Sequence, residues 1–454
     1  MAIGAAPTRG RWAWTFRDAP VAALLLFAAG GGVVIDLWWA TTPAVGRTPG
    51  EPLIAAGRVL GLLSGYLVSV GLVLMARIPV LERLLGADRL ARWHAMIGRY
   101  VVWSIVAHAT LITFGYAMRA HTGAGHQLIT FWSTFPYVLM ATAAFALFIL
   151  VGVTSVRAAR RRLAYETWYL VHLYGYLAIA LAFAHQFANG AQFAGHRTNR
   201  LVWAAMYLTA ATAVLTFRVL LPLARAFRHR LTVTRVVAES PTSVSIHLSG
   251  AHLAGWGGQA GQFVRLRFLT HGRWWQSHPY SLSAVPDGMS LRVTVKGVGD
   301  HTRDLARLTP GARVVAEGPY GAMTARRRTR QKVLLIAGGI GITPLRALFE
   351  DLQGGPADLT LLYRAAHEEE LVFRSELDEL AGRGQGTIRY LVGPREGTGS
   401  GDPLSRANLR GLLPDIAEHD VYVCGPPSLM ASAIQTLRAL GVPRRRIHTE
   451  RFAL

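Results

Sequence analysis

Residues 332–345 read KVLLIAGGIGITPL: an apolar strand-like run, a cluster of glycines and the start of a helix. A glycine turn between a strand and a helix is the context in which backbone N–H groups cradle a phosphate. The glycines are not spaced as GxGxxG, so they do not form the usual dinucleotide-binding fingerprint. A further strand is predicted at 358–363, and this strand, helix, strand order predicts a parallel sheet.

The segment before this sheet has a different pattern of apolar and polar residues. The runs FVRLRF at 263–268 and LRVTVK at 291–296 alternate apolar and polar residues, and Gly/Pro turns separate them. Alternation with period two is typical of antiparallel strands, so we expect an antiparallel barrel here. The basic run Arg326–Arg330 then predicts a surface linker between the barrel and the parallel sheet.

The first 230 residues are much more apolar. The whole chain of 454 residues is 51% hydrophobic and 16% charged with a net charge of +22, which is too apolar for a basic nucleic-acid-binding chain. A membrane-spanning helix needs about 20 apolar residues. Stretches of about this length lie at 20–40, 53–75, 95–117, 134–156, 168–188 and 201–221. The sequence therefore predicts a six-helix membrane bundle, with membrane lipid as its surroundings and no nucleic-acid partner.

The predicted architecture has four parts. They are a cytoplasmic N-terminus (1–19), a six-helix transmembrane domain (20–224), an antiparallel barrel domain (225–328) and an α/β parallel-sheet domain (329–454). The first apolar stretch also has the arginines of a signal peptide before it. However, it contains Asp36 and ends near Trp38 and Trp39 without a small-residue cleavage pattern, so we favour a retained helix.

Arginines divide unevenly between the two sides of the bundle. Fourteen lie before the first stretch, between the second and third, between the fourth and fifth, and after the sixth, whereas the other loops hold four. By the positive-inside rule, both termini are cytoplasmic. The single cysteine, Cys424, excludes an internal disulfide and a Cys-ligated iron–sulfur cluster built by this chain alone.

Four histidines lie inside the predicted spans. His94 and His108 are in the third stretch, and His172 and His185 are in the fifth. Ionisable groups inside a bilayer are functional candidates, although any one of them alone is more often a packing residue. His94 and His108 are 14 residues apart, so they share a helix face and are separated by about 21 Å. At matched depths, the pairs His94/His172 and His108/His185 suit the axial ligands of two b-type haems.

In the fifth stretch, the spacing of the two histidines does not place them on one face of an ideal helix. His172 and His185 are 13 residues apart, which places them about 220° apart around an ideal helix. A π-bulge or a bend between them would bring both side chains to one face. Trp103 lies between the two histidines of the third stretch, where it either fills the space between two haems or packs in the bundle.

Several motifs of the second half suit nucleotide chemistry, and each also has an ordinary structural explanation. SHPYSLS at 277–283 offers an aromatic ring and a hydroxyl to a flavin, or is a plain strand. KGVGDHT at 296–302 offers backbone N–H groups to a diphosphate, or is a capped turn. VYVCGPP at 421–427 ends a buried strand, where Cys424 lies at a ligand edge or in the core.

The order HPYS, GDHT, GPYG (318–321), AGGIGITP, CGPP and a terminal ERF resembles the ferredoxin–NADP reductase superfamily. Preceded by six helices with paired histidines, the chain resembles the ferric reductase / NADPH oxidase family of transmembrane flavocytochromes b. The resemblance implies FAD, two b-type haems and NADPH as cofactors, with NADH as the alternative. It also implies an NAD(P)H-dependent oxidoreductase in the plasma membrane. That family also uses the 13-residue spacing, which favours a distorted fifth helix over abandoning the haems.

The resemblance also assigns residues. It places the FAD ring system and ribityl chain on His278, Pro279, Tyr280 and Ser281, and the FAD diphosphate on Lys296, Gly299 and Thr302. It places the nicotinamide nucleotide's diphosphate on Gly338, Gly339, Gly341 and Thr343, its 2′-phosphate on Arg364, and its nicotinamide on Cys424, Gly425 and Pro426. Glu450 and Phe452 match the terminal motif whose aromatic ring covers the flavin, although here two residues follow the phenylalanine.

The implied function is electron transfer from cytosolic NADPH through FAD and two haems to an acceptor outside, either O2 or a ferric chelate. Arg58 resembles an arginine beside the outer haem, or it is a snorkelling residue. Ile112 replaces a histidine of the oxidases, which argues against O2. The alternatives are an electron-relay subunit that reduces a quinone or an extracytoplasmic protein, and a membrane protein with a decayed reductase domain. The sequence identifies no protein partner.

Overall fold

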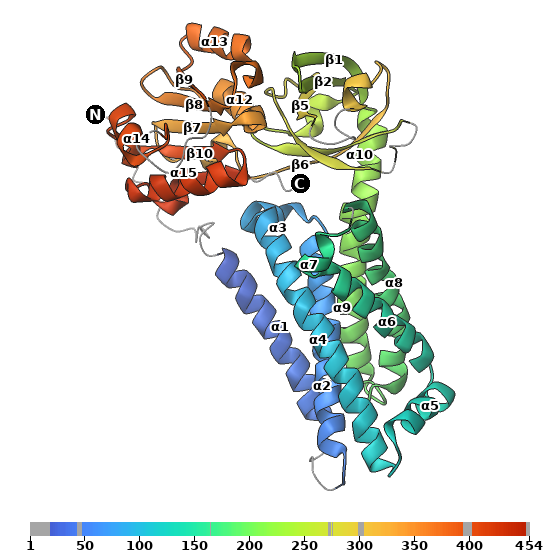
Figure 1. Ribbon diagram of the computed structural model, residues 1–454. Coiled ribbons are helices and arrows are strands. Elements are labelled where there is room, and N and C mark those ends of the chain that lie inside the picture. The colour runs from blue at the N-terminus through green and yellow to red at the C-terminus, as the bar shows by residue number, and fades with distance from the viewer. Residues whose placement is uncertain are drawn as a thin grey trace, which may run out of the picture. The chain divides into compact units, whose positions relative to one another are not determined.

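The computed structural model describes residues 19–42, 48–163, 165–270, 274, 276–297, 304–393 and 402–450 (Figure 1). The chain forms two compact units, Met1–Val219 and Leu220–Leu454. The first unit is helical and the second contains the sheets, as the apolar and polar halves of the sequence predict.

The helices of the first unit are α1 (Ala19–Thr41), α2 (Glu51–Met75), α3 (Pro79–Leu85), α4 (Ala87–Arg119), α5 (Ala124–Thr134), α6 (Val138–Ser155), α7 (Arg157–Arg160), α8 (Tyr165–Asn189) and α9 (Arg197–Leu215). A π-helical turn at Thr216–Leu220 continues α9 into α10 (Leu221–His229), the first helix of the second unit. Within the described residues, six helices are long and apolar enough to cross a membrane, which confirms the predicted bundle.

Small residues let α2 pack closely against its neighbours. A Cβ atom added at Gly57 would lie 2.9 Å from the Ile112 side chain on α4, and one added at Gly65 would lie 2.8 Å from the Trp203 ring on α9. Small residues at helix contacts permit such close backbone approach in membrane bundles. The helix pairs α2/α4 and α6/α8 are the closest in this unit, and Figure 1 shows each pair side by side.

The second unit begins with two three-stranded antiparallel sheets in the strand orders β1-β2-β5 and β4-β3-β6. Their strands are β1 (Thr232–Ser240), β2 (Ser243–Ser249), β3 (Phe263–Phe268), β4 (His278–Ser281), β5 (Ser290–Lys296) and β6 (Val314–Tyr320). Burial alternates along β3, whose Val264, Leu266 and Phe268 enter the core. The antiparallel barrel domain is confirmed.

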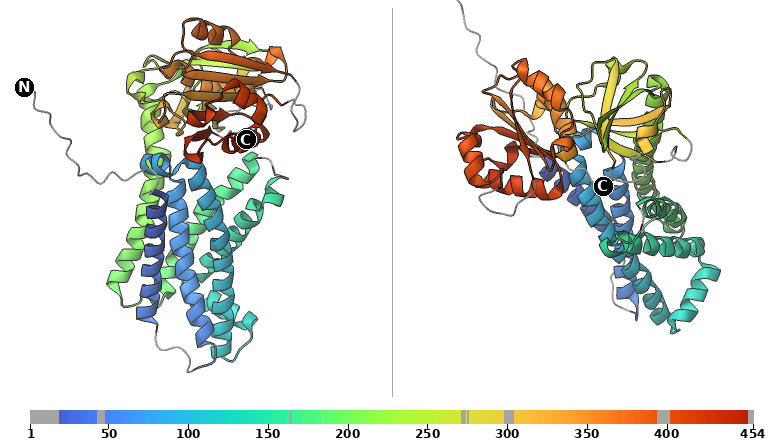
Figure 2. Two further views of the ribbon diagram at one scale, coloured as in Figure 1. Left: turned by 90° about the vertical axis from the view of Figure 1, so that its left-hand side faces the viewer. Right: turned by 45° about the horizontal axis from the view of Figure 1, so that its top comes forward.

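The parallel sheet has the strand order β11-β10-β7-β8-β9. Its strands are β7 (Val333–Gly338), β8 (Leu359–Ala365), β9 (Thr387–Val392), β10 (Asp420–Cys424) and β11 (Ile447–Glu450). Alternate β7 residues enter separate cores, which α12 (Ile342–Asp351) and α13 (Arg374–Gly382) cover on one face, and α14 (Arg406–Leu412) and α15 (Pro427–Ala439) on the other. Figure 2 shows this α/β layer beside the barrel within the second unit.

Ion pairs join the barrel to the parallel-sheet domain. Arg292 on β5 binds Glu376 on α13 through two nitrogens, with distances of 2.6 and 2.9 Å. Arg346 Nε on α12 lies 2.9 Å from Glu376 Oε2, so one carboxylate serves two guanidinium groups. Lys296 Nζ, at the end of β5, lies 3.0 Å from Glu370 Oε1. These contacts fix the two domains of this unit against each other.

Candidate functional site

The chain order of the parallel sheet reverses between β7 and β10. From β7 the chain proceeds outward to β8 and β9, and it returns on the other side to β10 and β11. Ligands of open α/β sheets bind at such a switch point, beyond the carboxyl ends of the strands. Gly338 ends β7 and Cys424 ends β10, so both predicted nucleotide motifs lie at the switch point.

The two motifs contact each other directly. A Cβ atom at Gly341 would collide with the carbonyl oxygen of Cys424, and one at Gly425 would lie 3.1 Å from the backbone of Gly338. Gly339 has φ +51°, and a Cβ there would meet nothing within 4 Å. The turn is thus tight against CGPP on one side and open on the other, as a phosphate-binding turn requires.

Two predicted residues have structural roles in this turn. Thr343 is 2% exposed, and its hydroxyl donates to the Ile340 carbonyl at 2.9 Å, so it closes the turn. Pro426 lies beside Gly338, where a Cβ would come within 3.1 Å of the proline ring. The hydroxyl proton of Thr343 is therefore used within the turn, and the expected place of Thr343 at the diphosphate stays a prediction.

Cys424 is fully buried, and its Sγ lies 3.7 Å from the Glu450 carbonyl oxygen on the paired strand β11. Burial raises the pKa of the thiol well above its usual range, with the Glu450 carboxylate a smaller cause. The thiol is therefore neutral and unsuited to nucleophilic chemistry. A Cβ at Gly321 would lie 3.5 Å from Glu450 Oε2, so the terminal strand reaches the GPYG segment of the barrel. Phe452 lies outside the described residues.

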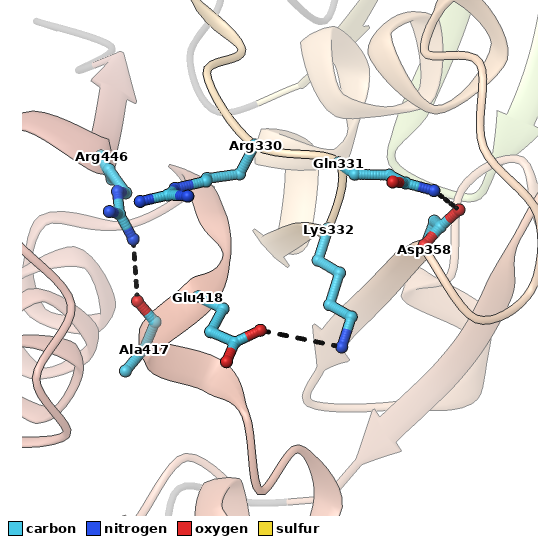
Figure 3. A pocket seen from close by; sticks show the side chains of 7 residues that line it. All are labelled: Arg330, Gln331, Lys332, Asp358, Ala417, Glu418 and Arg446. Atoms are coloured by element: carbon cyan, nitrogen blue, oxygen red, sulfur yellow. Dashed lines mark hydrogen bonds and ion pairs between the residues drawn. The ribbon is translucent and has the colours of Figure 1, made fainter.

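Arg364 lies near the carboxyl end of β8, which is the edge where the prediction places it. It lines a 30 Å³ cavity together with Asp402, Leu404, Leu429 and Ser432. A separate groove of 760 Å³ lies at the opposite edge of the sheet, before β7, β8, β10 and β11 (Figure 3). Its lining residues are Arg330, Gln331, Lys332, Asp358, Ala417, Glu418 and Arg446. This groove is not at the switch point, so it is distinct from the predicted nucleotide site.

The predicted flavin motif forms the edge strand β4. Pro279 is exposed, whereas Tyr280 is 7% exposed and packs against Phe268 in the barrel core, with ring centroids 6.5 Å apart. Burial raises the pKa of the Tyr280 phenol well above its usual range. Ser281 Oγ is buried and has no hydrogen-bond partner among the described residues, so a polar group of FAD would satisfy it. His278 is half-buried on the same strand.

The predicted diphosphate motif is only partly described. Gly299 and Thr302 lie outside the described residues. Lys296 is described, and its ammonium group pairs with Glu370 of the nucleotide domain rather than projecting as an unpaired cation. The Lys296 ammonium lowers the pKa of the Glu370 carboxyl. Lys296 therefore contributes to the contact between the domains, a role that its local sequence motif does not reveal.

In the first unit, His94 and His172 meet across the bundle. Their ring centroids are 5.9 Å apart, although α4 packs mainly on α2 and α8 packs mainly on α6. An imidazole nitrogen binds a transition metal at about 2 Å, so two imidazoles on opposite sides of one metal have centroids about 6 Å apart. The observed separation therefore fits one metal between the rings.

His108 and His185 form the second predicted pair and lie within electrostatic range of each other. His108 Nδ1 donates to the Gly57 carbonyl oxygen at 2.7 Å, and His94 Nδ1 donates to the Gly71 carbonyl oxygen at 3.1 Å. His185 Nδ1 is buried and has no hydrogen-bond partner among the described residues. Each α4 imidazole thus keeps Nε2 for a ligand, and His185 has an unsatisfied nitrogen.

This donor set fits a haem better than a bare metal ion. Within the described ranges, no three His, Cys, Asp or Glu side chains converge as a protein-built metal site needs. Two imidazoles are nevertheless sufficient when a porphyrin supplies the other four nitrogens. The residues present therefore fit two bis-histidine haem sites, with His94, His108, His172 and His185 as the ligands.

Three related predictions have different outcomes. Arg58 Nη2 donates to the Tyr116 hydroxyl at 3.3 Å, and no described carboxylate pairs with it. Trp103 is 73% exposed and lies about 180° around the helix from His94, so it neither fills an inter-haem space nor packs in the bundle. Of the two distortions considered between His172 and His185, the π-bulge is absent, because α8 is α-helical throughout, and the bend stays a prediction. A π-helical turn lies after α9 instead.

Comparisons with known proteins identify all three parts of the chain. The models that match are the ferric reductase like transmembrane component at residues 60–183, the FAD-binding domain at 231–324 and the oxidoreductase NAD-binding domain at 335–435. Ferredoxin--NADP reductase B of Sorangium cellulosum is 34% identical over 210 residues, which are 43% of this chain and 85% of that protein.

Other relatives share the same half of the chain. The flavohemoprotein of Burkholderia sp. strain TH2 is 29% identical over 48% of this chain and 58% of its own length. The FAD/NAD-binding domain of the nitric oxide dioxygenase of Vibrio cholerae is 26% identical and covers 49% of this chain and 97% of that structure, with a TM-score of 0.39. The chain is an NAD(P)H-dependent oxidoreductase, and it belongs to the ferric reductase family of transmembrane proteins with ferredoxin–NADP reductase-like FAD and NAD(P) domains.

Proposed function

We propose that the chain transfers electrons from cytosolic NADPH, through FAD and two b-type haems, to a small-molecule acceptor on the other side of the plasma membrane. The observation that carries the proposal is the pairing of imidazoles across the bundle, with the His94 and His172 rings 5.9 Å apart. The 14-residue spacing of His94 and His108 places the second pair about 21 Å along the same helix. Two such sites in sequence give a path through the apolar half of the chain.

The bound groups supply the redox chemistry: FAD accepts a hydride and releases single electrons, and the haem irons carry these singly. The chain itself binds and orients. The open side of the turn at Gly339 receives the nucleotide diphosphate, and the Arg364 guanidinium recognises a 2′-phosphate, which favours NADPH over NADH. The buried Ser281 hydroxyl hydrogen-bonds the flavin.

The direction of transfer follows from the arginines. Their enrichment in alternate loops supports a cytoplasmic position for both termini and for the nucleotide-binding unit. With the N-terminus inside, odd-numbered spans run outward, so His94 and His172 lie toward the cytoplasm and His108 and His185 toward the outside. His94 and His172 would then hold the haem that receives electrons, and His108 and His185 the haem that passes them on.

His108 and His185 would hold the outer haem, which would supply single electrons to the acceptor without binding it, because both imidazoles would already ligate the iron. O2, giving superoxide, and ferric chelates both suit this geometry. Arg58 lies next to Gly57, whose carbonyl accepts from His108, and its charge has no described carboxylate partner. A cation there would attract an anionic acceptor such as a ferric chelate, or balance a haem propionate.

Two assays distinguish O2 from ferric chelates as the acceptor. Both use membranes that contain the full-length chain, with NADPH added. Superoxide production is measured as cytochrome c reduction that superoxide dismutase suppresses, and ferric-chelate reduction is measured in the same membranes. His172→Ala is expected to abolish both, whereas His126→Ala, at an exposed position on α5, is expected to retain both. If neither acceptor is reduced while a quinone or an added extracytoplasmic protein is, the electron-relay function replaces the proposal. Full activity in His172→Ala would refute the electron path.

A further inference from the structure

The hydrogen bonds of His94 and His108 go to two residues of one helix, α2, that have the same spacing as the two histidines. Both acceptors are glycine carbonyls of α2, Gly71 for His94 and Gly57 for His108. Gly57 and Gly71 are 14 residues apart, as are His94 and His108. On two antiparallel helices, equal spacing means equal rise, about 21 Å on each. One helix without any predicted ligand thus contacts both imidazoles of the ligand-bearing helix α4.

These contacts fix the protonation of both rings. A carbonyl oxygen only accepts hydrogen bonds, so each Nδ1 must carry a proton and each neutral ring presents an unprotonated Nε2. Metal-binding histidines usually donate their other N–H to such an acceptor, which orients the ring and raises its basicity. The α2 carbonyls therefore prepare Nε2 of both α4 histidines for iron.

The outer contact depends on a second glycine. In an α-helix the Gly57 carbonyl also accepts from the N–H of Gly61, so a ring that reaches this carbonyl must lie beside residue 61. A Cβ atom at Gly61 would lie 2.7 Å from His108 Nδ1 and 2.8 Å from its Cε1. Such distances are too short for two non-bonded atoms, so an alanine would displace the ring.

The histidines on α8 are held differently. His172 Nδ1 lies 3.3 Å from the Ser155 hydroxyl, which either donates or accepts. His185 Nδ1 is buried without a hydrogen-bond partner in the described part of the chain. Each proposed haem would therefore have one ligand fixed by a backbone carbonyl and one with a weaker constraint.

We propose that α2 positions the axial ligands of both haems: the Gly57 and Gly71 carbonyls orient His108 and His94, and Gly61 provides the space that His108 needs. This inference rests on the proposed haem sites. It assigns a function to Gly61 that packing between helices alone does not require, because a side chain there would first meet a histidine ring rather than another helix backbone. Gly61 is thus a positioning residue for the outer haem.

The test compares Gly61→Ala with Gly32→Ala in the purified full-length protein. Gly32 lies on α1, which carries no histidine, and a Cβ there would meet nothing within 4 Å, so it controls for the same substitution in a membrane helix. Haem per protein and a redox titration of the haem spectrum are measured, with bound flavin as the folding control. Gly61→Ala is expected to halve the haem content and remove one titration component, whereas Gly32→Ala keeps both. Two unchanged components in Gly61→Ala would overturn the inference.

A second comparison does not require Gly61→Ala to fold. In His108→Gly, added imidazole can bind iron and still donate an N–H to the Gly57 carbonyl, whereas 1-methylimidazole can bind iron but has no N–H to donate. 4-Methylimidazole controls for size, because it carries the extra methyl group but keeps an N–H. Imidazole and 4-methylimidazole are expected to restore the second component of the haem titration, whereas 1-methylimidazole is expected to restore an amplitude that is several-fold smaller. Equal rescue by all three would refute the role of the carbonyl. A wild-type protein without haem would instead refute the proposed function itself.

Discussion

The Glu376 carboxylate is predicted to be the main polar link between the barrel and the nucleotide domain. Glu376→Gln keeps the shape of the side chain but removes its charge. Arg292, with a side chain only 10% exposed, would then lose its described carboxylate partner, while Arg346 would keep Glu350. Breaking a buried ion pair costs about 3–5 kcal/mol and an exposed one about 0–1 kcal/mol. Because the Glu376 side chain is 32% exposed, we expect an intermediate loss of about 2 kcal/mol.

The assay is thermal release of FAD fluorescence from the full-length protein at a fixed scan rate. For a unit of this size, a loss of about 2 kcal/mol lowers the midpoint by roughly 4–8 °C. Glu379→Gln is the matched control, because Glu379 lies on the same helix and pairs with Arg383 through side chains that are 62% and 70% exposed. We expect that control to change stability by less than about 0.5 kcal/mol. Equal midpoints for the two variants would refute the reasoning.

The stability lost in Glu376→Gln should depend on pH, because the pKa of the Glu376 carboxyl differs between the folded and unfolded states. Burial raises the pKa of the Glu376 carboxyl, but Arg292 and Arg346 outweigh burial and hold it below its ordinary value of 4.5. A carboxyl with a lowered folded pKa stabilises fully above its unfolded pKa, and this stabilisation disappears as pH falls through the folded pKa. The difference between wild type and Glu376→Gln should therefore be constant above pH 4.5 and shrink below it. A difference that grows on acidification would contradict the assignment.

Three further predictions concern the nucleotide site. In Gly341→Ala, the new methyl group would collide with the Cys424 carbonyl. We expect this variant to retain flavin and to raise the KM for NADPH in ferricyanide reduction by about tenfold or more. Gly382→Ala, where a Cβ meets nothing within 4 Å, should leave that KM unchanged. Arg364→Ala is expected to raise the KM for NADPH about tenfold and leave that for NADH unchanged, so an equal effect on both would exclude a 2′-phosphate contact. Cys424 is fully buried and neutral, so iodoacetamide at pH 8 should label it only after unfolding, as mass spectrometry would detect.

Local patterns in the sequence predict the architecture well. The run from Lys332 to Leu345 contains a whole strand, glycine turn and helix start, and these form as β7 and α12. The apolar stretches form six helices because a span of about 20 apolar residues is a property of one continuous segment. The four histidines are recognised for the same reason, since their spacing lies within single helices.

Contacts between distant segments could not be predicted in this way. The pairing of Lys296 with Glu370 joins residues 74 positions apart, so the lysine is used in a domain contact that no local motif reveals. Tyr280 packs into the barrel core because its strand pairs with β3, which places the ring against Phe268. The hydrogen bond of Thr343 within the turn likewise follows from the folded backbone rather than from residue type.

The contacts of α2 with the two histidines have a signal in the sequence. Gly57 and Gly71 repeat the 14-residue spacing of His94 and His108, and matched spacings on neighbouring antiparallel helices predict paired contacts. The 13-residue spacing of His172 and His185 predicts a π-bulge or a bend, and α8 contains no π-bulge. The actual π-helical turn, at Thr216–Leu220, carries no sequence mark that distinguishes it from the rest of its apolar span.

The central claim is that two histidine pairs hold two haems within the bundle. The most direct test is the reduced-minus-oxidised absorption spectrum of the purified full-length protein, with haem and flavin measured per chain. The account predicts a b-type spectrum with two haems per chain in wild type and His126→Ala, and with one in His108→Ala, while flavin stays constant. A wild-type protein that binds flavin but shows no haem after expression with ample haem would contradict the account.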